Sequence, residues 1–379
     1  MKTSLWQTFA LEMDEKRPGF AKGPWFTMNT VLTLDGELDP DLLADAFQQL
    51  QQRHEVLRTE VCSDRLQLIH PEPRSALELV DEVSSHAPVD IARPIRLLLA
   101  GNQLALHLHH MVSDPVTLWE TVTELAALYS GQELPPPAQY TDYTAAETDQ
   151  VRRTSTEAAA WWHSKVRDTK VSPQPSSTGD PLAFRDDLLS AQEVVTVDAL
   201  TKQHRSTPLV TYLAALAHGM DPHVGPGDTL AFTTLFGKRD RPAWQHLLGP
   251  CIVPSYLAIP RGIDIAAVRD AVVGCSRYAR YPASAIYETI PDAQRTPFFE
   301  YVPQQWPTGF TFGTVKAEVA AAAGPKDTGL ADALAIRVRT RTDGVLTGHF
   351  SADGTDWTDP LVHQVRAGFR DYLLHEEGT

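Results

Sequence analysis

The sequence has few basic residues for its size. Its 379 residues carry 33 Lys and Arg against 48 Asp and Glu, which gives a formal net charge of −15. Proteins that bind nucleic acid or anionic membranes by bulk electrostatics carry an excess of positive charge. The composition therefore disfavours both nucleic acid and membrane as partners.

Cysteine is scarce, and long apolar runs are absent. Cys62, Cys251 and Cys275 stand far apart without CxxC spacing, so the sequence indicates neither a disulfide framework nor a zinc knuckle. No segment approaches the roughly 20 apolar residues that a membrane span requires, and the N-terminus has no uninterrupted apolar region typical of a secretion signal. We therefore expect a cytoplasmic protein.

The length and one change of composition predict two domains. A chain of 379 residues corresponds to about two ordinary domains. Residues 168–181 are rich in Ser, Pro and Gly with hardly any apolar residue, which is typical of a linker. We predict an N-terminal domain over residues 1–167, a linker over 168–181 and a C-terminal domain over 182–379.

Hydrophobic periodicity predicts both strands and helices in each half. The first half contains a strand at 28–34, a helix after Asp39, a hairpin of strands 95–100 and 103–110, and a helix that begins at Asp114. In the second half the predicted helices are 209–218 and 361–374, and the predicted strands are 229–236, 252–259, 334–340 and 345–350. Because strands and helices do not alternate regularly, we expect an α+β sandwich in each half.

The segment HLHHMVSDP, residues 107–115, concentrates the chemical signal. Strand alternation places His107 and His109 on one face and His110 on the other. Neutral imidazole can accept a proton from an attacking group and return it to a leaving group. The sequence contains no GxSxG elbow, and no cysteine has an activating context. A direct transfer with histidine as base is therefore favoured over a covalent nucleophile.

Three other interpretations of this segment stay open. Asp114 precedes a proline and a helical pattern, which is typical of an N-cap. The second interpretation is that the histidines are core residues with satisfied hydrogen bonds. Metal binding through His107, His109 and Asp114 is the third alternative, although the sequence offers no second cluster with ligand spacing.

Four segments, in order, resemble the condensation domains of nonribosomal peptide synthetases, members of the chloramphenicol-acetyltransferase-like acyltransferase superfamily. Residues 34–61 end in a match to RHExLRT, and residues 89–115 lead into a match to HHxxxDG. Residues 134–147, followed by two tryptophans, are similar to the QYxDYAxWQ region. Residues 236–250 are similar to the GR segment that precedes the family's GxFxNT motif.

The resemblance implies a fold and roles for named residues. The fold is two chloramphenicol-acetyltransferase-like α/β sandwich lobes in a V-shaped pseudo-dimer with a central tunnel. His110 matches the second histidine of the motif, which is the base or positioning group, and His109 matches the first, mainly structural one. Asp114 matches the aspartate that forms an ion pair, with Arg239 as the expected partner and Arg58 as the second candidate.

Two departures concern the expected substrate tunnel, which we expect Ser113, Pro115 and Val253 to line. Pro115 replaces the family's glycine and has no N–H, so any backbone donor at that position is lost. Val253 and Pro254 stand where the family has Asn-Thr, and proline cannot donate to a sheet ladder.

The resemblance predicts a free-standing acyltransferase. It would transfer an acyl group from the phosphopantetheine thioester of an acyl or peptidyl carrier protein, docked in trans, to a small-molecule amine or alcohol. No metal and no tightly bound cofactor is expected. The alternatives are an acyl-CoA donor, or a catalytically degenerate protein that recruits partners or steers an intermediate. Because such carriers are usually acidic, this acidic chain needs a local basic surface, for which Arg277 with Arg280 and Arg152 with Arg153 are candidates.

Overall fold

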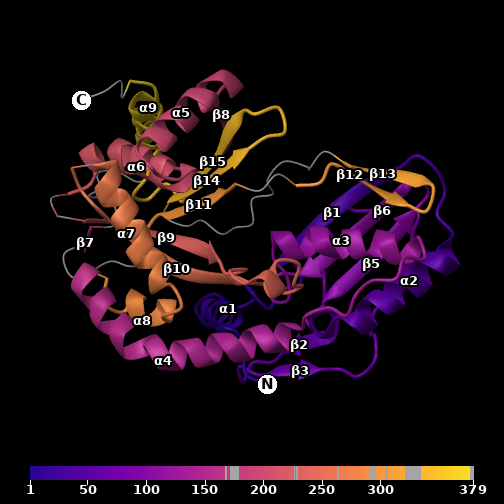
Figure 1. The fold of residues 1–379 in the computed structure, drawn as a ribbon. Helices are drawn as coiled ribbons and strands as arrows, with labels where there is room; N and C mark the ends of the chain where they lie inside the picture. The colour runs from indigo at the N-terminus through magenta and orange to yellow at the C-terminus, as the bar shows by residue number, and fades with distance from the viewer. Residues whose placement is uncertain are drawn as a thin grey trace. The chain divides into compact units, whose positions relative to one another are not determined.

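A computed structural model of the chain describes residues 1–166, 169–170, 179–225, 227, 229–262, 264–290, 296–303, 306–320 and 334–375. It contains two compact units (Figure 1). The first unit comprises Met1–Arg152, Gly237–Val253 and Trp306–Lys326, and the second comprises Arg153–Phe236, Pro254–Gln305 and Asp327–Thr379. Each unit contains a β-sheet and helices, in agreement with the predicted two-lobe α+β fold.

The first unit is built on a six-stranded sheet in the order β12-β13-β1-β6-β5-β4. Its strands are β1 (Thr27–Leu34), β4 (Leu77–Leu79), β5 (Ile95–Ala100), β6 (Gln103–His109), β12 (Gly309–Phe312) and β13 (Val315–Val319). β5 and β6 form the predicted hairpin. Its turn contains Gly101, whose φ of +53° lies in the left-handed region that glycine adopts at no steric cost.

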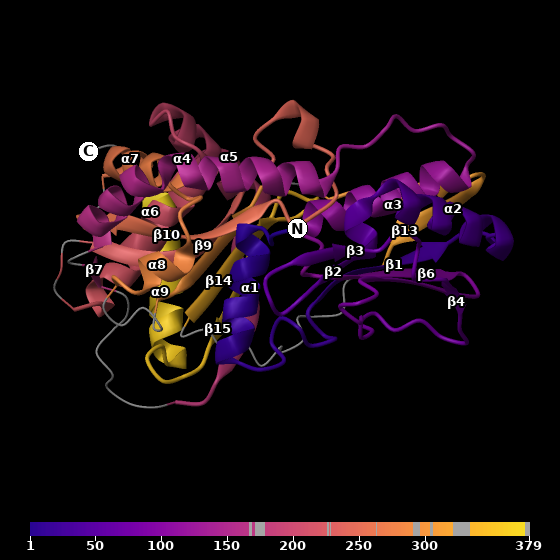
Figure 2. The ribbon, with the colours of Figure 1, turned by 90° about the horizontal axis from the view of Figure 1, so that it is seen from below.

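Helices α2 (Pro40–Arg53) and α3 (Pro115–Tyr129) lie on the same side of this sheet (Figure 2). Both begin as the sequence predicts, with an aspartate N-cap followed by proline. Their apolar faces enter one buried core with alternate residues of the strands; members of this core include Leu43, Phe47, Leu106, Leu118 and Val122.

The remaining elements of the first unit are one longer helix and several short segments. They are α1 (Leu5–Lys16), η1 (Glu55–Arg58), β2 (Thr59–Val61), β3 (Gln67–Ile69), η3 (Pro242–Trp244) and the first half of α4 (Tyr140–Val166). Ser4 and Gln7 close a capping box at the start of α1.

The second unit has a sheet in the order β10-β9-β11-β14-β15-β8, with β7 paired to β9. Its strands are β7 (Thr169–Lys170), β8 (Leu182–Leu189), β9 (Thr229–Gly237), β10 (Ile252–Pro260), β11 (Phe298–Val302), β14 (Leu334–Thr340) and β15 (Leu346–Ala352). Its helical segments are α5 (Ala191–Gln203), α6 (Pro208–Met220), η2 (Asp221–His223), α7 (Ile265–Arg277), α8 (Ala283–Tyr287) and α9 (Asp359–His375).

Helices α5, α6 and α9 gather beside β8, β15 and β14 (Figure 1). Gly219 of α6 allows a close approach to α9, because a Cβ atom there would lie 2.4 Å from the Val365 carbonyl oxygen. Pro254 lies in β10, the first strand of the sheet order, where a missing N–H is tolerated.

The units do not follow the domain limits predicted from composition. Most of the predicted linker, residue 168 and residues 171–178, lies outside the described residues. Two segments from the second half of the sequence, Gly237–Val253 and Trp306–Lys326, belong to the first unit. The second of these supplies β13, which pairs with β1. Composition cannot reveal such returns, because strand pairing depends on contacts distant in sequence.

No helix in the described part of the chain has the length and apolar character needed to cross a bilayer. All three cysteines are free thiols.

Candidate active site

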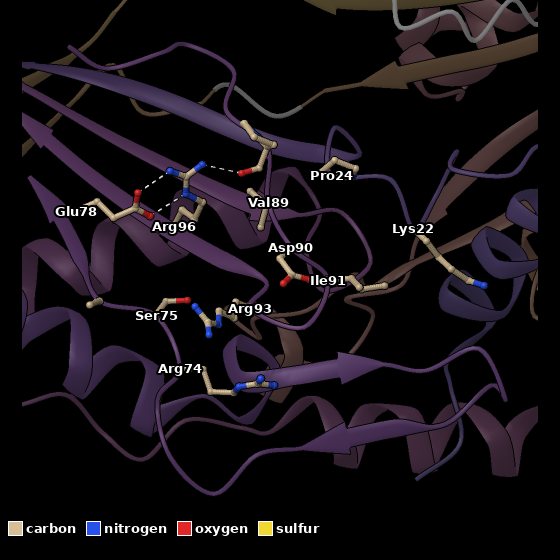
Figure 3. Close-up of a pocket in the computed structure, with 12 residues that line it drawn as sticks. Lys22, Pro24, Arg74, Ser75, Glu78, Val89, Asp90, Ile91, Arg93 and Arg96 are labelled. Carbon is tan, nitrogen blue, oxygen red and sulfur yellow. Dashed lines mark hydrogen bonds and ion pairs between the residues drawn. The ribbon is translucent and has the colours of Figure 1, made fainter. Parts of the chain in front are cut away.

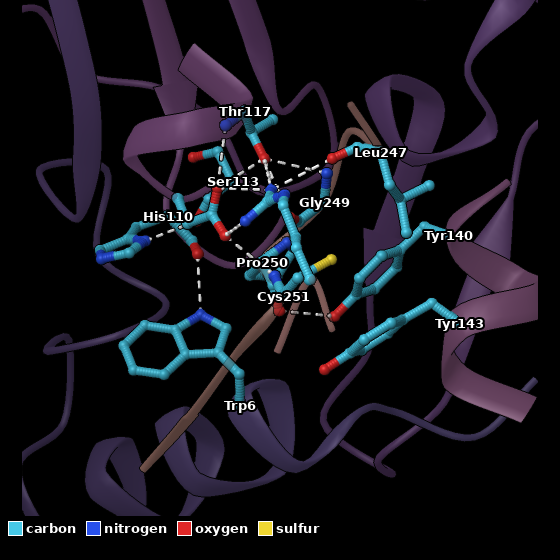
Figure 4. Close-up of polar contacts among 12 residues, drawn as sticks. Trp6, His110, Ser113, Thr117, Tyr140, Tyr143, Leu247, Gly249, Pro250 and Cys251 are labelled. Carbon is cyan, nitrogen blue, oxygen red and sulfur yellow. Dashed lines mark hydrogen bonds and ion pairs between the residues drawn. The ribbon is translucent and has the colours of Figure 1, made fainter. Parts of the chain in front are cut away.

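His110 lies in the turn that follows β6 and is held through its backbone. Its N–H donates to the Phe26 carbonyl oxygen at 2.7 Å, and its own carbonyl accepts from Trp6 Nε1 at 2.9 Å (Figure 4). Its ring packs against the rings of Trp6 and Phe26, with both centroids 4.8 Å away. Two aromatic side chains, one from α1 and one from the residue before β1, therefore fix the position of the imidazole.

The side chain of His110 has a defined tautomer. Nδ1 lies 2.7 Å from the Ser113 carbonyl oxygen. A carbonyl oxygen only accepts hydrogen bonds, so Nδ1 carries the proton and Nε2 of the neutral ring carries a lone pair. This is the arrangement that a general base requires: one nitrogen orients the ring and the other accepts a proton.

His107 and His109 have a different character, although all three histidines are close in sequence. Both are fully buried in β6. Burial, followed by the positive charge of Arg96, lowers the pKa of His107 to about 4. Burial, followed by the proximity of His110, lowers the pKa of His109 to about 4. Both rings are therefore neutral core residues at neutral pH.

Asp114 has its carboxylate buried and surrounded by five donors. Oδ1 accepts from the backbone N–H of Thr117 at 2.8 Å, from the Thr117 hydroxyl at 2.8 Å and from Arg239 Nη2 at 2.8 Å. Oδ2 accepts from Arg239 Nη1 at 2.7 Å and from the backbone N–H of Cys251 at 2.9 Å. Asp114 is thus both the N-cap of α3 and half of a bidentate ion pair.

Arg239 reaches Asp114 from the segment between β9 and β10. Its Nη2 also donates to the carbonyl oxygens of Leu247 and Gly249, at 3.1 and 3.0 Å. Although burial alone would lower it, the charge of Asp114 raises the pKa of Arg239 above its ordinary value. Arg239 therefore stays charged, and its hydrogen bonds to Asp114 tie this segment to the start of α3 within the first unit.

Gly249 completes the Asp114 cluster, which we define as Asp114, Thr117, Arg239, Gly249 and Cys251. Its φ of +134° favours glycine, and a Cβ atom there would lie 2.1 Å from Cδ2 of Tyr140. The hydroxyl of that tyrosine donates to the Pro250 carbonyl oxygen at 3.1 Å (Figure 4). The tyrosine ring therefore packs directly against the backbone of the segment that carries Arg239.

The other residues singled out from the sequence lie in different settings. Arg58, the second candidate partner of Asp114, donates instead to the carbonyl oxygens of Gln51 and His70. Ser113 is fully buried, and its hydroxyl donates to the His109 carbonyl at 3.0 Å. Pro115 is half-buried at the first turn of α3, and Val253 is fully buried in β10. Their place along a substrate tunnel stays a prediction.

The alternatives to a histidine base gain no support from the geometry. Among the described residues, no three His, Cys, Asp or Glu side chains gather as metal ligands would. Burial raises the pKa of the Cys62 thiol and raises that of Cys275 to about 12. Neither thiol is therefore poised to ionise as a nucleophile.

Several residues of this site were not assigned from the sequence. Thr117 stands three residues after the cap, where an N-cap side chain finds its backbone donor, so capping rules contain its signal. Tyr140 lies inside the matched QYTDY segment. Trp6 and Phe26 have no comparable signal, because single aromatic residues near a chain start belong to no motif.

The chain was compared with known proteins. No protein-family model matches it. It is 26% identical over 319 residues to surfactin synthase subunit 1 of Bacillus subtilis (strain 168). The matched region covers 73% of this chain and 9% of the relative. It is 32% identical over 143 residues to tyrocidine synthase 3 of Brevibacillus parabrevis. This matched region covers 32% of this chain and 2% of the relative. The chain therefore spans about a tenth or less of these curated relatives.

Solved structures resemble nearly the whole chain. The condensation domain of the Monacolin K polyketide synthase MokA has a TM-score of 0.76 at 16% identity, covering 98% of this chain and 96% of its own. The SgcC5 protein of Streptomyces globisporus has a TM-score of 0.75 at 16% identity, covering 99% and 98%. The X-domain from teicoplanin biosynthesis, in complex with OxyB, has a TM-score of 0.73 at 18% identity, covering 98% and 92%. At these identities the likeness establishes the fold.

Proposed function

The chain has the fold of a condensation domain and nonribosomal peptide synthetases as sequence relatives, and we propose that it transfers an acyl group from a thioester to an amine or hydroxyl. The donor is an acyl or peptidyl carrier protein bearing phosphopantetheine, with acyl-CoA as the other thioester source. The observation that supports this most directly is the hydrogen bond from His110 Nδ1 to the Ser113 carbonyl, 2.7 Å long. It leaves Nε2 as the proton acceptor.

In the proposed reaction, Nε2 of His110 accepts the proton of the acceptor's N–H or O–H group as that atom attacks the thioester carbonyl. The C–S bond then breaks, and the imidazolium returns the proton to the departing thiolate. Such proton transfer accelerates a reaction by roughly 10²–10⁴-fold, and holding both reactants together adds to this. No tightly bound cofactor is needed for these steps.

Other residues support this base without touching substrate. His109 is a buried, neutral residue that precedes the turn carrying His110. The Asp114 cluster fixes the start of α3, which follows Ser113. Pro115 supplies no backbone N–H, so it offers no donor to a developing oxyanion. A hydroxyl acceptor is consistent with the SgcC5 protein, whose structure contains a naphthyl ethanediol.

A second function has an observation in its favour. The X-domain has the same fold and was solved bound to OxyB, so a protein of this fold can serve as a docking partner. In that case the chain recruits another protein, and His110 is a residue of the fold without a proton-transfer role.

The deciding experiment compares His110→Asn with the wild type. The Asn amide can still donate to the Ser113 carbonyl but provides no base at the Nε2 position. Acyl-loaded carrier protein and acyl-CoA are offered in parallel to candidate amines and alcohols, with products followed by intact mass spectrometry. We expect turnover to fall by about 10²–10⁴-fold. His246→Asn, at an exposed histidine paired with Glu120, is the matched control and should leave turnover unchanged.

Equal turnover by His110→Asn and the wild type would disprove the role of His110 as base. Turnover by neither protein with any donor, combined with stable binding of a partner protein, would favour recruitment.

A further inference from the structure

A cavity of about 660 Å³ lies in the first unit, and none of the residues that line it belongs to the Asp114 cluster (Figure 3). Its charged lining consists of four cations and two carboxylates: Lys22, Arg74, Arg93, Arg96, Glu78 and Asp90. We call it the cationic pocket. The lining has an excess of two positive charges, whereas the chain has a net charge of −15. Such a group of cations on an acidic protein favours an anionic ligand.

Most of these charges already have partners. Arg96 binds Glu78 with two hydrogen bonds, of 2.8 and 2.5 Å, and donates to the Pro88 carbonyl (Figure 3). Arg74 contacts Glu60 at 3.4 Å, and Lys22 lies 3.7 Å from Asp14.

Arg93 differs from these cations, because its side chain makes no ion pair or hydrogen bond with any described residue. Its backbone N–H donates to the Asp90 carbonyl at 2.9 Å, which fixes the turn that presents it. Figure 3 places Arg93 between Ser75 and Asp90, among the labelled lining residues. A guanidinium in this position has its donors available to a ligand.

The shape and walls of the cationic pocket favour an organic molecule over a simple ion. Its volume falls within the range of small-molecule sites, about 300–1,000 Å³. Apolar wall comes from Pro24, Pro88, Val89 and Ile91. Arg93, whose guanidinium has no partner among the described residues, suits a phosphate group, which guanidinium forks bind with paired hydrogen bonds.

The cationic pocket is also connected to the candidate base. The Val89 N–H donates to the Pro24 carbonyl at 2.7 Å, and two residues later the Phe26 carbonyl accepts the backbone N–H of His110. The His109 backbone N–H donates to the Pro94 carbonyl, one residue beyond Arg93. The segments that line the pocket therefore lie next to the residues whose carbonyl groups hold the backbone of His109 and His110.

We infer that the cationic pocket binds the phosphate group of a small organic ligand, with Arg93 as its principal contact. The identity of the ligand rests on the proposed function, which supplies such a phosphate on the pantetheine arm of a carrier protein or on CoA. The recognised chemistry, a phosphate ester beside an apolar body, rests on the pocket alone.

The test measures binding by calorimetry at fixed ionic strength, without turnover. Phosphopantetheine is compared with pantetheine, which lacks only the phosphate. We expect the wild type to bind the phosphorylated form about 10- to 100-fold more tightly, the effect of one or more hydrogen bonds between charged groups. Arg93→Gln should abolish this preference. Arg152→Gln, at an exposed arginine paired with Asp149, should retain it.

Two outcomes would overturn the inference: equal binding of the two compounds by the wild type, or an unchanged preference in Arg93→Gln. CoA and phosphopantetheine-loaded carrier protein, tested in the same way, distinguish the two sources of the phosphate. His110→Asn should bind phosphopantetheine like the wild type. A wild type that prefers phosphopantetheine but turns over no donor would therefore contradict the proposed function and leave the assignment of the pocket intact.

Discussion

The Asp114 cluster and the cationic pocket belong to the same unit but treat charge in opposite ways. In the cluster, one carboxylate with 1% exposure receives five hydrogen bonds, two of them from a single guanidinium. In the pocket, Arg93 is exposed and has no partner for its side chain among the described residues. The first arrangement is complete within the chain, whereas the second has unused donors.

This difference separates structural charge from charge available for binding. A buried ion whose hydrogen bonds are all made holds segments together, and removing one member leaves the other unpaired in a poorly solvated site. An exposed cation without a partner adds little to stability. The contrast predicts opposite responses to substitution of two arginines.

The largest effect is expected from Arg239→Met, which leaves Asp114 buried without its cation. Loss of one member of a buried pair costs about 3–5 kcal/mol in the free energy of unfolding. The measurement is urea unfolding followed by circular dichroism. Arg152→Met, at an exposed ion pair, is the control and should cost less than about 1 kcal/mol.

A double variant tests whether the cost comes from the unpaired carboxylate. Asp114→Leu with Arg239→Met removes both charges and should be more stable than Arg239→Met alone, although the N-cap is lost. A double variant as unstable as, or less stable than, that single variant would contradict the account of the cluster as a compensated pair.

Acidification should lower the stability of the fold through its buried histidines, which are neutral at neutral pH. The folded-state pKa of His107 is about 4, below its ordinary value of 6.5. The unfolded chain therefore takes up this proton first, so stability is complete above about pH 6.5 and declines as the pH falls toward 4. The contribution of His107 is on the order of 3 kcal/mol.

The measurement is the unfolding free energy of His107→Leu and of the wild type at pH 7 and pH 4.5. The variant should lose less of its own stability between these values, because it has no imidazole to protonate on unfolding. Identical losses in the two proteins would show that His107 does not titrate as its burial predicts.

An effect of similar size is expected from Gly249→Ala, which tests the packing around the cluster. The new methyl group would overlap the Tyr140 ring at a φ of +134°, so overpacking and backbone strain should together cost about 2–4 kcal/mol. Thermal unfolding is a suitable measurement. Gly237→Ala is the matched control, since a Cβ atom at Gly237 meets nothing within 4 Å.

The smallest effect is expected from Arg93→Gln. With no side-chain partner to lose, this variant should keep its unfolding free energy within about 0.5 kcal/mol of the wild type. The same urea titration applies. A loss as large as that of Arg239→Met would show that Arg93 is structural and would remove the contrast between the two sites.

Local rules predicted much of the fold. Asp39 and Asp114 predict the starts of α2 and α3, because an N-cap and a following proline act within one helical turn. The pairing of Asp114 with Arg239 spans 125 residues, and only the resemblance to condensation domains suggested it. The prediction of a base at His110 stays a prediction, although the hydrogen bond to Ser113 gives it a tautomer.

The remainder lay beyond local rules. Residues 237–253 and 306–320 join the first unit through tertiary pairing, which leaves no periodic or compositional trace. Arg277 and Arg152, two of the residues considered for a basic surface, form ion pairs with Glu157 and Asp149, and that surface stays a prediction. The cationic pocket instead collects single cations from separate strands and loops, none of them next to another in the sequence.

The pairing of β13 with β1 has a consequence for the newly synthesised chain. The ribosome releases β1 nearly three hundred residues before Val319 becomes available to pair with Leu32. Until then β1 is an open sheet edge, a feature that invites pairing with other chains. Arg239 likewise emerges long after Asp114. The nascent first unit is therefore incomplete through most of translation, and protection of this edge by a chaperone would matter most during that interval.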